Sequence, residues 1–178
     1  YDAMTYEYGR YHENALGEYN YNFMQPENGE NPVDTFFANF NWGKSEVDYS
    51  ISTAKWINRN PYDVLAGLEL QKGGSYKTNV DWNAILDEHG KLRLSLGLYA
   101  PDTITGLGKT GEGYHTHEDL FWTGFQGDPT KGKPADQSWY GMSNLVVDKT
   151  PITSADFNTS FNTGHGKHWF VDGKIYKE

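Results

Sequence analysis

The strongest constraint on the fold is an alternation of strand-like and helix-like segments. Short apolar runs rich in strand-favouring residues occur at Val33–Phe40, Val64–Gln71 and Leu92–Ala100. Segments that we expect to be helical precede and separate these runs, at Glu13–Met24, which Gln25-Pro26 ends, and at Lys44–Asn58 and Asn79–His89. Such strict alternation predicts parallel strands that are covered by helices and joined by right-handed crossovers. A doubly wound sheet and a (β/α) barrel both satisfy this order.

The limits of the predicted helices come from local signals. In the Lys44–Asn58 segment, helical spacing relates Val47, Ile51, Ala54 and either Ile57 or Asn58, and the Asn60-Pro61 pair is a stop signal. In the Asn79–His89 segment one face carries Val80, Ala84 and Ile85, and Gly90 is the expected C-cap.

Beyond Ala100 the alternation stops. Residues Gly106–Asp148 are rich in Gly, Thr, Lys and Pro, and we expect a long loop there. Aromatic residues recur through it and favour an ordered, functional loop over a disordered one: Tyr114, Phe121, Trp122, Phe125, Trp139 and Tyr140.

Composition excludes several classes of protein. The formal net charge of −9 and the lack of a basic stripe make nucleic acid a poor partner. The absence of cysteine removes disulfide scaffolds, thiolate zinc sites and cysteine nucleophiles, and it suits a cytoplasmic protein or a Gram-positive type of exported protein. No apolar run is long enough for a membrane span. The chain has no signal peptide and opens at Tyr1 rather than Met, so we expect a piece of a longer protein.

Ligands of parallel α/β folds bind at the carboxyl ends of the strands. Those positions carry aromatic and acidic side chains in this sequence: Trp42, Glu69, Tyr99 and Asp102, with Tyr1–Met4 as the tail of an earlier strand. Because aromatic rings stack on sugar faces and carboxylates hold sugar hydroxyls, this edge predicts a carbohydrate site. Two alternatives stay open: Glu69 is a solvated or salt-bridged strand end, and Trp42 packs beneath the following helix.

Other chemical signals are weak. Glu69 and Asp102 could form the acid/base pair of an ordinary glycosidase. His115-Thr116-His117-Glu118-Asp119 could hold a metal ion, but without a third ligand at a defined spacing an exposed loop cluster is favoured. Gly106–Gly113 lacks a phosphate-loop pattern, and no nucleophile elbow is present.

Four motifs together resemble family 85 glycoside hydrolases. They are YDAM at Tyr1–Met4, NPYDVLAGLELQ at Asn60–Gln71, LSLGLYAPD at Leu94–Asp102 and FNTGHGKHWFVDGK at Phe161–Lys174. The resemblance implies an endo-β-N-acetylglucosaminidase that hydrolyses the GlcNAc-β1,4-GlcNAc core of N-glycans. It also implies a TIM-like (β/α)8 barrel followed by β-sandwich domains, with neither a cofactor nor a metal.

The mechanism implied by the resemblance is substrate-assisted. The substrate's acetamido oxygen attacks the anomeric carbon and forms an oxazolinium intermediate, so no enzyme nucleophile is needed. An Asn orients the acetamido group, and a Glu two residues later protonates the leaving oxygen. That Asn-x-Glu motif is absent from this sequence. Residues 1–178 are therefore expected to be the C-terminal half of the catalytic barrel, from about its fifth strand to its end, with the N-terminal half as partner.

The resemblance also suggests roles for single residues. Tyr1 matches the Tyr that hydrogen-bonds the acid/base Glu, Trp42 a Trp that walls the sugar site, Glu69 a carboxylate that contacts substrate hydroxyls, and Tyr99 an aromatic that closes the site. His12 stands where the family usually has a Trp at the acceptor side, which puts transglycosylation in doubt.

Two rival functions remain. A non-catalytic glycan-binding module would keep the sugar-binding edge without the Asn-x-Glu strand, and a purely structural fragment would bury the aromatic residues. The expected location is extracellular or at the cell surface, with the cytoplasm as an alternative.

Overall fold

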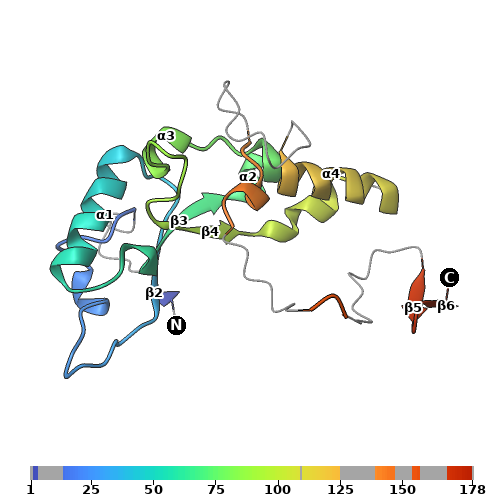
Figure 1. Ribbon diagram of the computed structural model, residues 1–178. Coiled ribbons are helices and arrows are strands. Elements are labelled where there is room, and N and C mark those ends of the chain that lie inside the picture. Colours follow the sequence, from blue (N-terminus) through green and yellow to red (C-terminus); the bar gives the residue numbers. More distant parts are fainter. Residues whose placement is uncertain are drawn as a thin grey trace.

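The protein is an α/β molecule built on a four-stranded parallel sheet. The computed structural model describes residues 2–3, 14–108, 110–124, 139–146, 154–156 and 168–177. The strands are β1 (Asp2–Ala3), β2 (Thr35–Ala38), β3 (Val64–Glu69) and β4 (Ser95–Tyr99), and they pair in chain order (Figure 1). Every pair is parallel. The predicted order and direction of the three apolar runs are thus confirmed, and Asp2–Ala3, within the predicted Tyr1–Met4 segment, form a strand before them.

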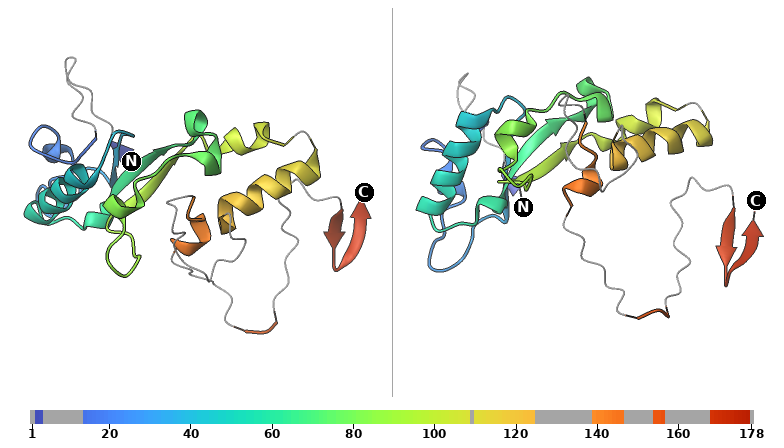
Figure 2. Two further views of the ribbon diagram at one scale, coloured as in Figure 1. Left: turned by 90° about the horizontal axis from the view of Figure 1, so that it is seen from above. Right: turned by 45° about the horizontal axis from the view of Figure 1, so that its top comes forward.

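Helices connect the strands and extend past them. The α-helices are α1 (Lys44–Trp56), α2 (Leu70–Gly73), α3 (Trp82–Ile85) and α4 (Gly111–Thr123). Short 3₁₀ helices are η1 (Tyr21–Phe23), η2 (Pro61–Asp63), η3 (Ser75–Lys77), η4 (Pro101–Gly106) and η5 (Met142–Asn144). Helices α1 and α4 lie at opposite ends of the sheet in all views, and α4 lies beyond the carboxyl ends of β3 and β4 (Figure 1 and Figure 2).

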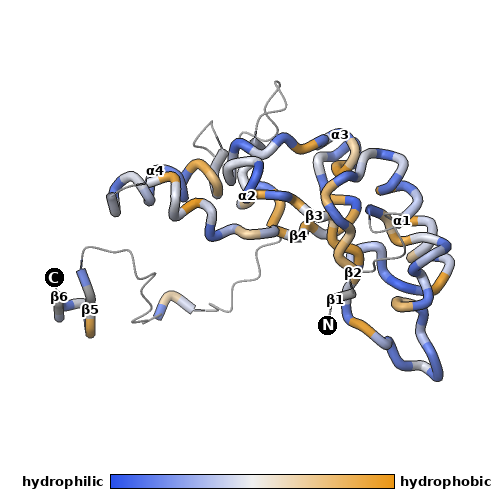
Figure 3. The backbone as a smooth tube through the Cα atoms, turned by 180° about the vertical axis from the view of Figure 1, so that it is seen from behind, coloured by the Kyte–Doolittle hydropathy of each residue, from blue (hydrophilic) through white to orange (hydrophobic). Residues whose placement is uncertain are grey.

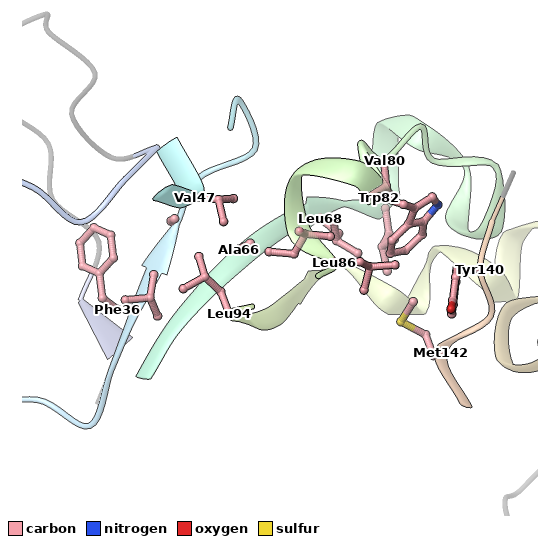
Figure 4. Packing of buried hydrophobic residues seen from close by; sticks show 14 of the residues in the cluster. Phe36, Val47, Ala66, Leu68, Val80, Trp82, Leu86, Leu94, Tyr140 and Met142 are labelled. Carbon is pink, nitrogen blue, oxygen red and sulfur yellow. The ribbon is translucent and has the colours of Figure 1, made fainter. Parts of the chain in front are cut away.

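One face of the sheet forms the core. Alternate strand residues such as Phe36, Ala66 and Leu68 are buried, and they pack with Val47 of α1 and with Trp82 of α3 (Figure 4). Side chains of successive strand residues point to opposite faces, so one set of alternate residues fills this core. The hydropathy of the chain follows the same division, with hydrophobic segments on the strands and hydrophilic ones in the outer loops (Figure 3).

Helix α1 agrees with the sequence prediction. Val47, Ala54 and Ile57 are buried, whereas Asn58 adopts a left-handed conformation just after the helix. The first turn is stabilised by Glu46, whose Oε2 accepts a hydrogen bond from the backbone N–H of Gly43 at 2.8 Å. The stop at Asn60-Pro61 is also present, because Pro61 begins η2.

The helix expected over Glu13–Met24 is wrong for the described residues. Residues 14–24 form turns and the short η1. The buried side chain of Asn20 accepts from the N–H of Gly17 at 2.8 Å and donates to the carbonyl of Ala15 at 2.9 Å. These local bonds compete with helical hydrogen bonding.

The helix expected over Asn79–His89 is reduced to the single turn of α3. After it, Leu86 pairs with Leu92 in an antiparallel bridge. The carboxylate of Asp87 accepts from the N–H groups of His89 and Lys91, at 2.9 and 2.8 Å, and so holds the turn closed. Gly90 has a positive φ of 73° in this turn and is not a helix C-cap.

The long loop expected at Gly106–Asp148 contains α4, so that part of the prediction is wrong. The side chain of Thr110 caps the helix by accepting from the N–H of Gly113 at 3.0 Å. Trp139 returns to stack on Phe121, and its indole N–H donates to the carbonyl of Phe121 at 2.8 Å. Several of the aromatic residues thus form a core, while Phe125 lies outside the described residues.

A buried arginine holds the chain that leads into β2. Buried Arg59 donates to the backbone carbonyls of Met24, Val33 and Asp34 and pairs with Asp63 at 2.9 Å, which fixes the segment leading into β2.

A separate antiparallel hairpin joins β5 (Trp169–Val171) to β6 (Lys174–Lys177). The residues of its tight turn, Asp172 and Gly173, both have positive φ, as a type I′ turn requires.

Candidate functional site at the carboxyl edge

The face of the sheet opposite the core carries a ring that rests on glycine. Gly67 of β3 and Gly97 of β4 are direct cross-strand partners. A Cβ atom at either position would overlap the ring of Phe37 from β2. Two glycines therefore make room for one phenyl ring across three strands, and this close approach explains why strand residues here lack side chains.

Glu69 and Tyr99 lie on the same face, at the carboxyl end of the strands. They are direct cross-strand partners and stand two residues beyond the Gly67–Gly97 pair. The side-chain period of a strand is two, so both point to the side on which Phe37 lies. The ring of Phe40 packs at a tilt against Tyr99, with centroids 5.2 Å apart. A carboxylate and a half-exposed aromatic ring are thereby brought together at the end of the strands.

Trp42 is anchored to β3. Its indole N–H donates to the carbonyl of Gly67 at 2.8 Å. β2 ends at Ala38, opposite Ala66, so this bond continues the hydrogen bonding of the sheet one step past the end of β2. The ring is half-buried and packs against the edge of the core. It therefore rests on the sheet with one part exposed, at the edge where Glu69 and Tyr99 end.

Glu69 also has a local structural role. Its Oε1 accepts from the backbone N–H of Lys72 at 3.4 Å, which caps the first turn of α2. The hydroxyl of Thr78 donates to the backbone carbonyl of Glu69 at 3.4 Å. These contacts hold a partly exposed carboxylate in place and agree with the alternative that Glu69 is a solvated strand end. The second carboxylate oxygen takes no part in the cap.

The chain leaves β4 through a strained residue. Ala100 has φ of 53° and ψ of 55°, a left-handed conformation that costs an L-residue about 1–2 kcal/mol. Pro101 follows and begins η4, and Asp102 lies exposed on that helix. This abrupt turn ends β4 directly after Tyr99. Asp102 does not extend the strand, and no contact of its carboxylate links it to Glu69 among the described residues.

The His115–Asp119 cluster lies on α4, which corrects the expected exposed loop. His117 stacks on Tyr76, and its Nδ1 lies 2.7 Å from the Tyr76 hydroxyl, while His115 faces Glu118 at 3.6 Å. The two imidazoles therefore have different neighbours. Within the described ranges no group of three or more His, Cys, Asp or Glu side chains could hold a metal ion.

Two of the predicted site residues, Tyr1 and His12, lie outside the described residues. The structure places Trp42, Glu69 and Tyr99 at one edge, and their roles toward a sugar stay a prediction. Sequence reasoning missed Phe37 and Phe40. The signal for Phe37 was the presence of glycines in two neighbouring apolar strands, Gly67 and Gly97.

The fold is an α/β domain with a carboxylate and aromatic rings at the carboxyl edge of its parallel sheet. The model of the family described as glycosyl hydrolase family 85 matches residues 1–169. The chain belongs to this family, whose members are endo-β-N-acetylglucosaminidases, as the four motifs indicated.

Two relatives agree with this assignment. The chain is similar to the glycoside hydrolase domain of Endo-D from Streptococcus pneumoniae R6, with 71% identity and a TM-score of 0.86 over 99% of this chain and 28% of that structure's chain. It is also 27% identical over 150 residues to the cytosolic endo-beta-N-acetylglucosaminidase of Danio rerio. The matched region is 82% of this chain and 18% of the relative. The chain thus spans less than a third of either relative.

Proposed function

We propose that this chain is part of an endo-β-N-acetylglucosaminidase that hydrolyses the GlcNAc-β1,4-GlcNAc core of N-glycans. The observation that carries the proposal is the carboxyl edge of the sheet, where Glu69 and Tyr99 pair across strands and Trp42 is anchored beside them. The enzyme names of both relatives support it.

In this proposal the chain supplies the sugar-binding part of a (β/α) barrel, with β1 to β4 as its fifth to eighth strands. The substrate's own acetamido oxygen attacks the anomeric carbon, and the Asn and Glu that assist it precede residue 1. Glu69 accepts hydrogen bonds from substrate hydroxyls, and the rings of Trp42 and Tyr99 pack on sugar faces. Tyr1 hydrogen-bonds the acid/base Glu, and His12 lies toward the acceptor.

The location belongs to the same proposal. Among the described helices none has the length and apolar character that crossing a bilayer requires. An extracellular or cell-surface enzyme would meet N-glycans on secreted proteins, and this is the location we propose. The fish relative is named cytosolic, so the cytoplasm is the alternative.

The test is the identity of the products. The complete protein that contains this chain should cleave an N-glycopeptide so that mass spectrometry finds one GlcNAc left on the peptide. Glu69→Gln keeps the size of the side chain and removes its charge, so we expect KM for the glycopeptide to rise about tenfold, or about 1.4 kcal/mol of binding. Glu88→Gln, an exposed site in the turn before β4, is the control.

Two outcomes would contradict the proposal. Release of the whole glycan with conversion of Asn to Asp would indicate an amidase. Tight binding of the glycopeptide without cleavage by the complete protein would favour the glycan-binding module instead.

A further inference from the structure

A cavity of mixed polar and apolar lining lies near the carboxyl end of β2. It has a volume of about 410 Å³ and lies between residues 14–20 and the first turns of α1. Asn41, the neighbour of Trp42 in the chain, lines it together with Asn14 and Ser45. We call this cavity the rim pocket. Because Asn41 and Trp42 both follow β2, the rim pocket lies close in the chain to the proposed sugar-binding edge.

The chemistry of the rim pocket suits a neutral polyhydroxylated ligand. Its walls offer the side-chain amides of Asn14 and Asn41, the hydroxyl of Ser45, and the carboxylates of Glu18 and Glu46. Amides and carboxylates can hold adjacent hydroxyl groups, because they provide paired donors or acceptors. None of the described residues that line it is basic, so a phosphate or carboxylate ligand is disfavoured.

An aromatic ring completes this chemistry. Tyr49 lines the rim pocket and is 47% exposed, so its ring can cover the C–H face of a sugar. The Tyr49 hydroxyl accepts from the backbone N–H of Glu18 at 3.0 Å, which fixes the ring. A Cβ atom at Gly17 would overlap this ring, so the glycine permits the arrangement.

The polar walls are also fixed before any ligand binds. Oε2 of Glu46 accepts from the N–H of Gly43 at 2.8 Å and from the hydroxyl of Ser45 at 2.9 Å, and Oε1 takes part in neither bond. The bond from Gly43, followed by that from Ser45, holds the pKa of Glu46 below its ordinary value. Asn14 accepts from the N–H of Asn41 at 3.2 Å, which joins the two walls. Pre-ordered groups lower the entropy cost of binding.

We propose that the rim pocket is an additional subsite for a neutral sugar of the glycoconjugate outside the two GlcNAc residues that are cleaved apart. This inference rests on the proposed function. The volume lies at the lower end of the range of about 300–1,000 Å³ seen for small-molecule sites, so it admits about one or two sugar rings. The sugar could belong to the mannose branches or to a residue attached to the peptide-linked GlcNAc.

The experiment fills the pocket in the complete protein. Ser45 is exposed on the first turn of α1, and Ser45→Tyr places a ring in the cavity. Ser52→Tyr is the matched control, because Ser52 is exposed on the same helix and does not line the rim pocket. Asn14→Ala is a second pocket variant that removes one amide. Equal thermal unfolding midpoints show that the variants are folded.

Three substrates separate the sources of the sugar. They are a chitobiosyl-asparagine with a single mannose, the same compound with a trimannosyl branch, and the single-mannose compound with fucose on the peptide-linked GlcNAc. We expect Ser45→Tyr to raise KM about tenfold for one of the two extended substrates and to leave the single-mannose substrate unchanged. Asn14→Ala should raise the same KM about threefold, and Ser52→Tyr should change none. The affected substrate identifies the source.

Equal KM values for Ser45→Tyr and the unmodified protein on all three substrates would overturn the subsite and leave the proposed function intact. If the unmodified protein cleaves neither these compounds nor the N-glycopeptide, the proposed function fails, and calorimetric titration with free trimannose and fucosyl-chitobiose decides the subsite. Binding that is lost in Ser45→Tyr and kept in Ser52→Tyr supports it. Binding that is absent, or equal in both variants, overturns it.

Discussion

The indole of Trp42 provides a hydrogen-bond donor and an apolar ring, and different substitutions can separate the two. Its N–H donates to the carbonyl of Gly67 in β3, and its ring offers apolar area at the edge of the sheet. Phe keeps most of the ring and removes the donor, whereas Ala removes both. Trp42→Phe therefore tests the hydrogen bond that orients the ring. Trp42→Ala also tests the contact of the ring with a sugar.

In the complete protein we expect Trp42→Phe to raise KM for an N-glycopeptide about fivefold with little change in kcat. Loss of the bond to Gly67 costs about 1 kcal/mol, and a binding contact present in both ground and transition states affects KM. Trp42→Ala should raise KM by about tenfold or more. Steady-state kinetics checks both, and Trp56→Phe, at a 67% exposed tryptophan at the end of α1, should leave both constants unchanged. A large fall in kcat for Trp42→Phe would show that Trp42 contributes to the chemical step.

At the scale of elements, the sheet depends on the fit of one ring against two strands. The ring of Phe37 occupies the space that a side chain at Gly97 would need. Strands β2 and β4 do not pair directly, so this contact across β3 is a tertiary link between them.

We expect Gly97→Ala to destabilise the complete protein by about 1–3 kcal/mol, because the added methyl overpacks the sheet. Gly106→Ala is the control, since a Cβ atom there has no neighbour within 4 Å. Urea unfolding of both variants gives the measurement. A second substitution, Phe37→Leu, should recover part of the loss in Gly97→Ala. If Gly97→Ala is as stable as Gly106→Ala, Phe37 does not rest on the glycines in solution.

The elements that the sequence predicts are those whose local signals agree with one another. Helix α1 has a buried stripe at helical spacing and a proline stop, and strands β2 to β4 are apolar runs between turn residues. Helix α4 was missed because Gly, His and Thr give it a low intrinsic propensity, and packing of Phe121 on Trp139 supplies what propensity lacks. Residues 14–24 were expected to be helical up to Gln25-Pro26, but the side chain of Asn20 forms local bonds in place of helical ones.

The candidate site was likewise predicted only in part from the sequence. Glu69 and Tyr99 could be placed at one edge from the sequence, because parallel strands end at a common edge. Their direct pairing depends on the register, which the sequence did not specify. Phe40 and the rim pocket depend on how the chain turns after β2 and on residues 14–20, whose structure local patterns did not predict.

At the scale of the whole molecule, β1 and β4 each pair on one side within the described sheet. Open strand edges are prone to association. We expect residues 1–178 alone to associate in a concentration-dependent way in sedimentation and to show no hydrolase activity. The proposed general acid lies outside these residues, and its loss alone would lower the rate by about two to four orders of magnitude.

Addition of the N-terminal half of the proposed barrel should reverse both properties, restoring cleavage of a high-mannose glycopeptide. The complete protein is the reference for activity. Robust cleavage by residues 1–178 alone would show that the catalytic groups lie within this chain.

The agreement between strand order and chain order also bears on how the polypeptide is made. Each of β2, β3 and β4 pairs with the strand that left the ribosome just before it. Domains generally fold as units during synthesis, beginning with their N-terminal parts, and contacts that are near in sequence form fastest. A growing sheet of this order always presents its newest edge to the next strand to emerge. Nascent chains that have exposed β3 but not β4 should therefore already protect the paired amides of β2 and β3 from hydrogen exchange.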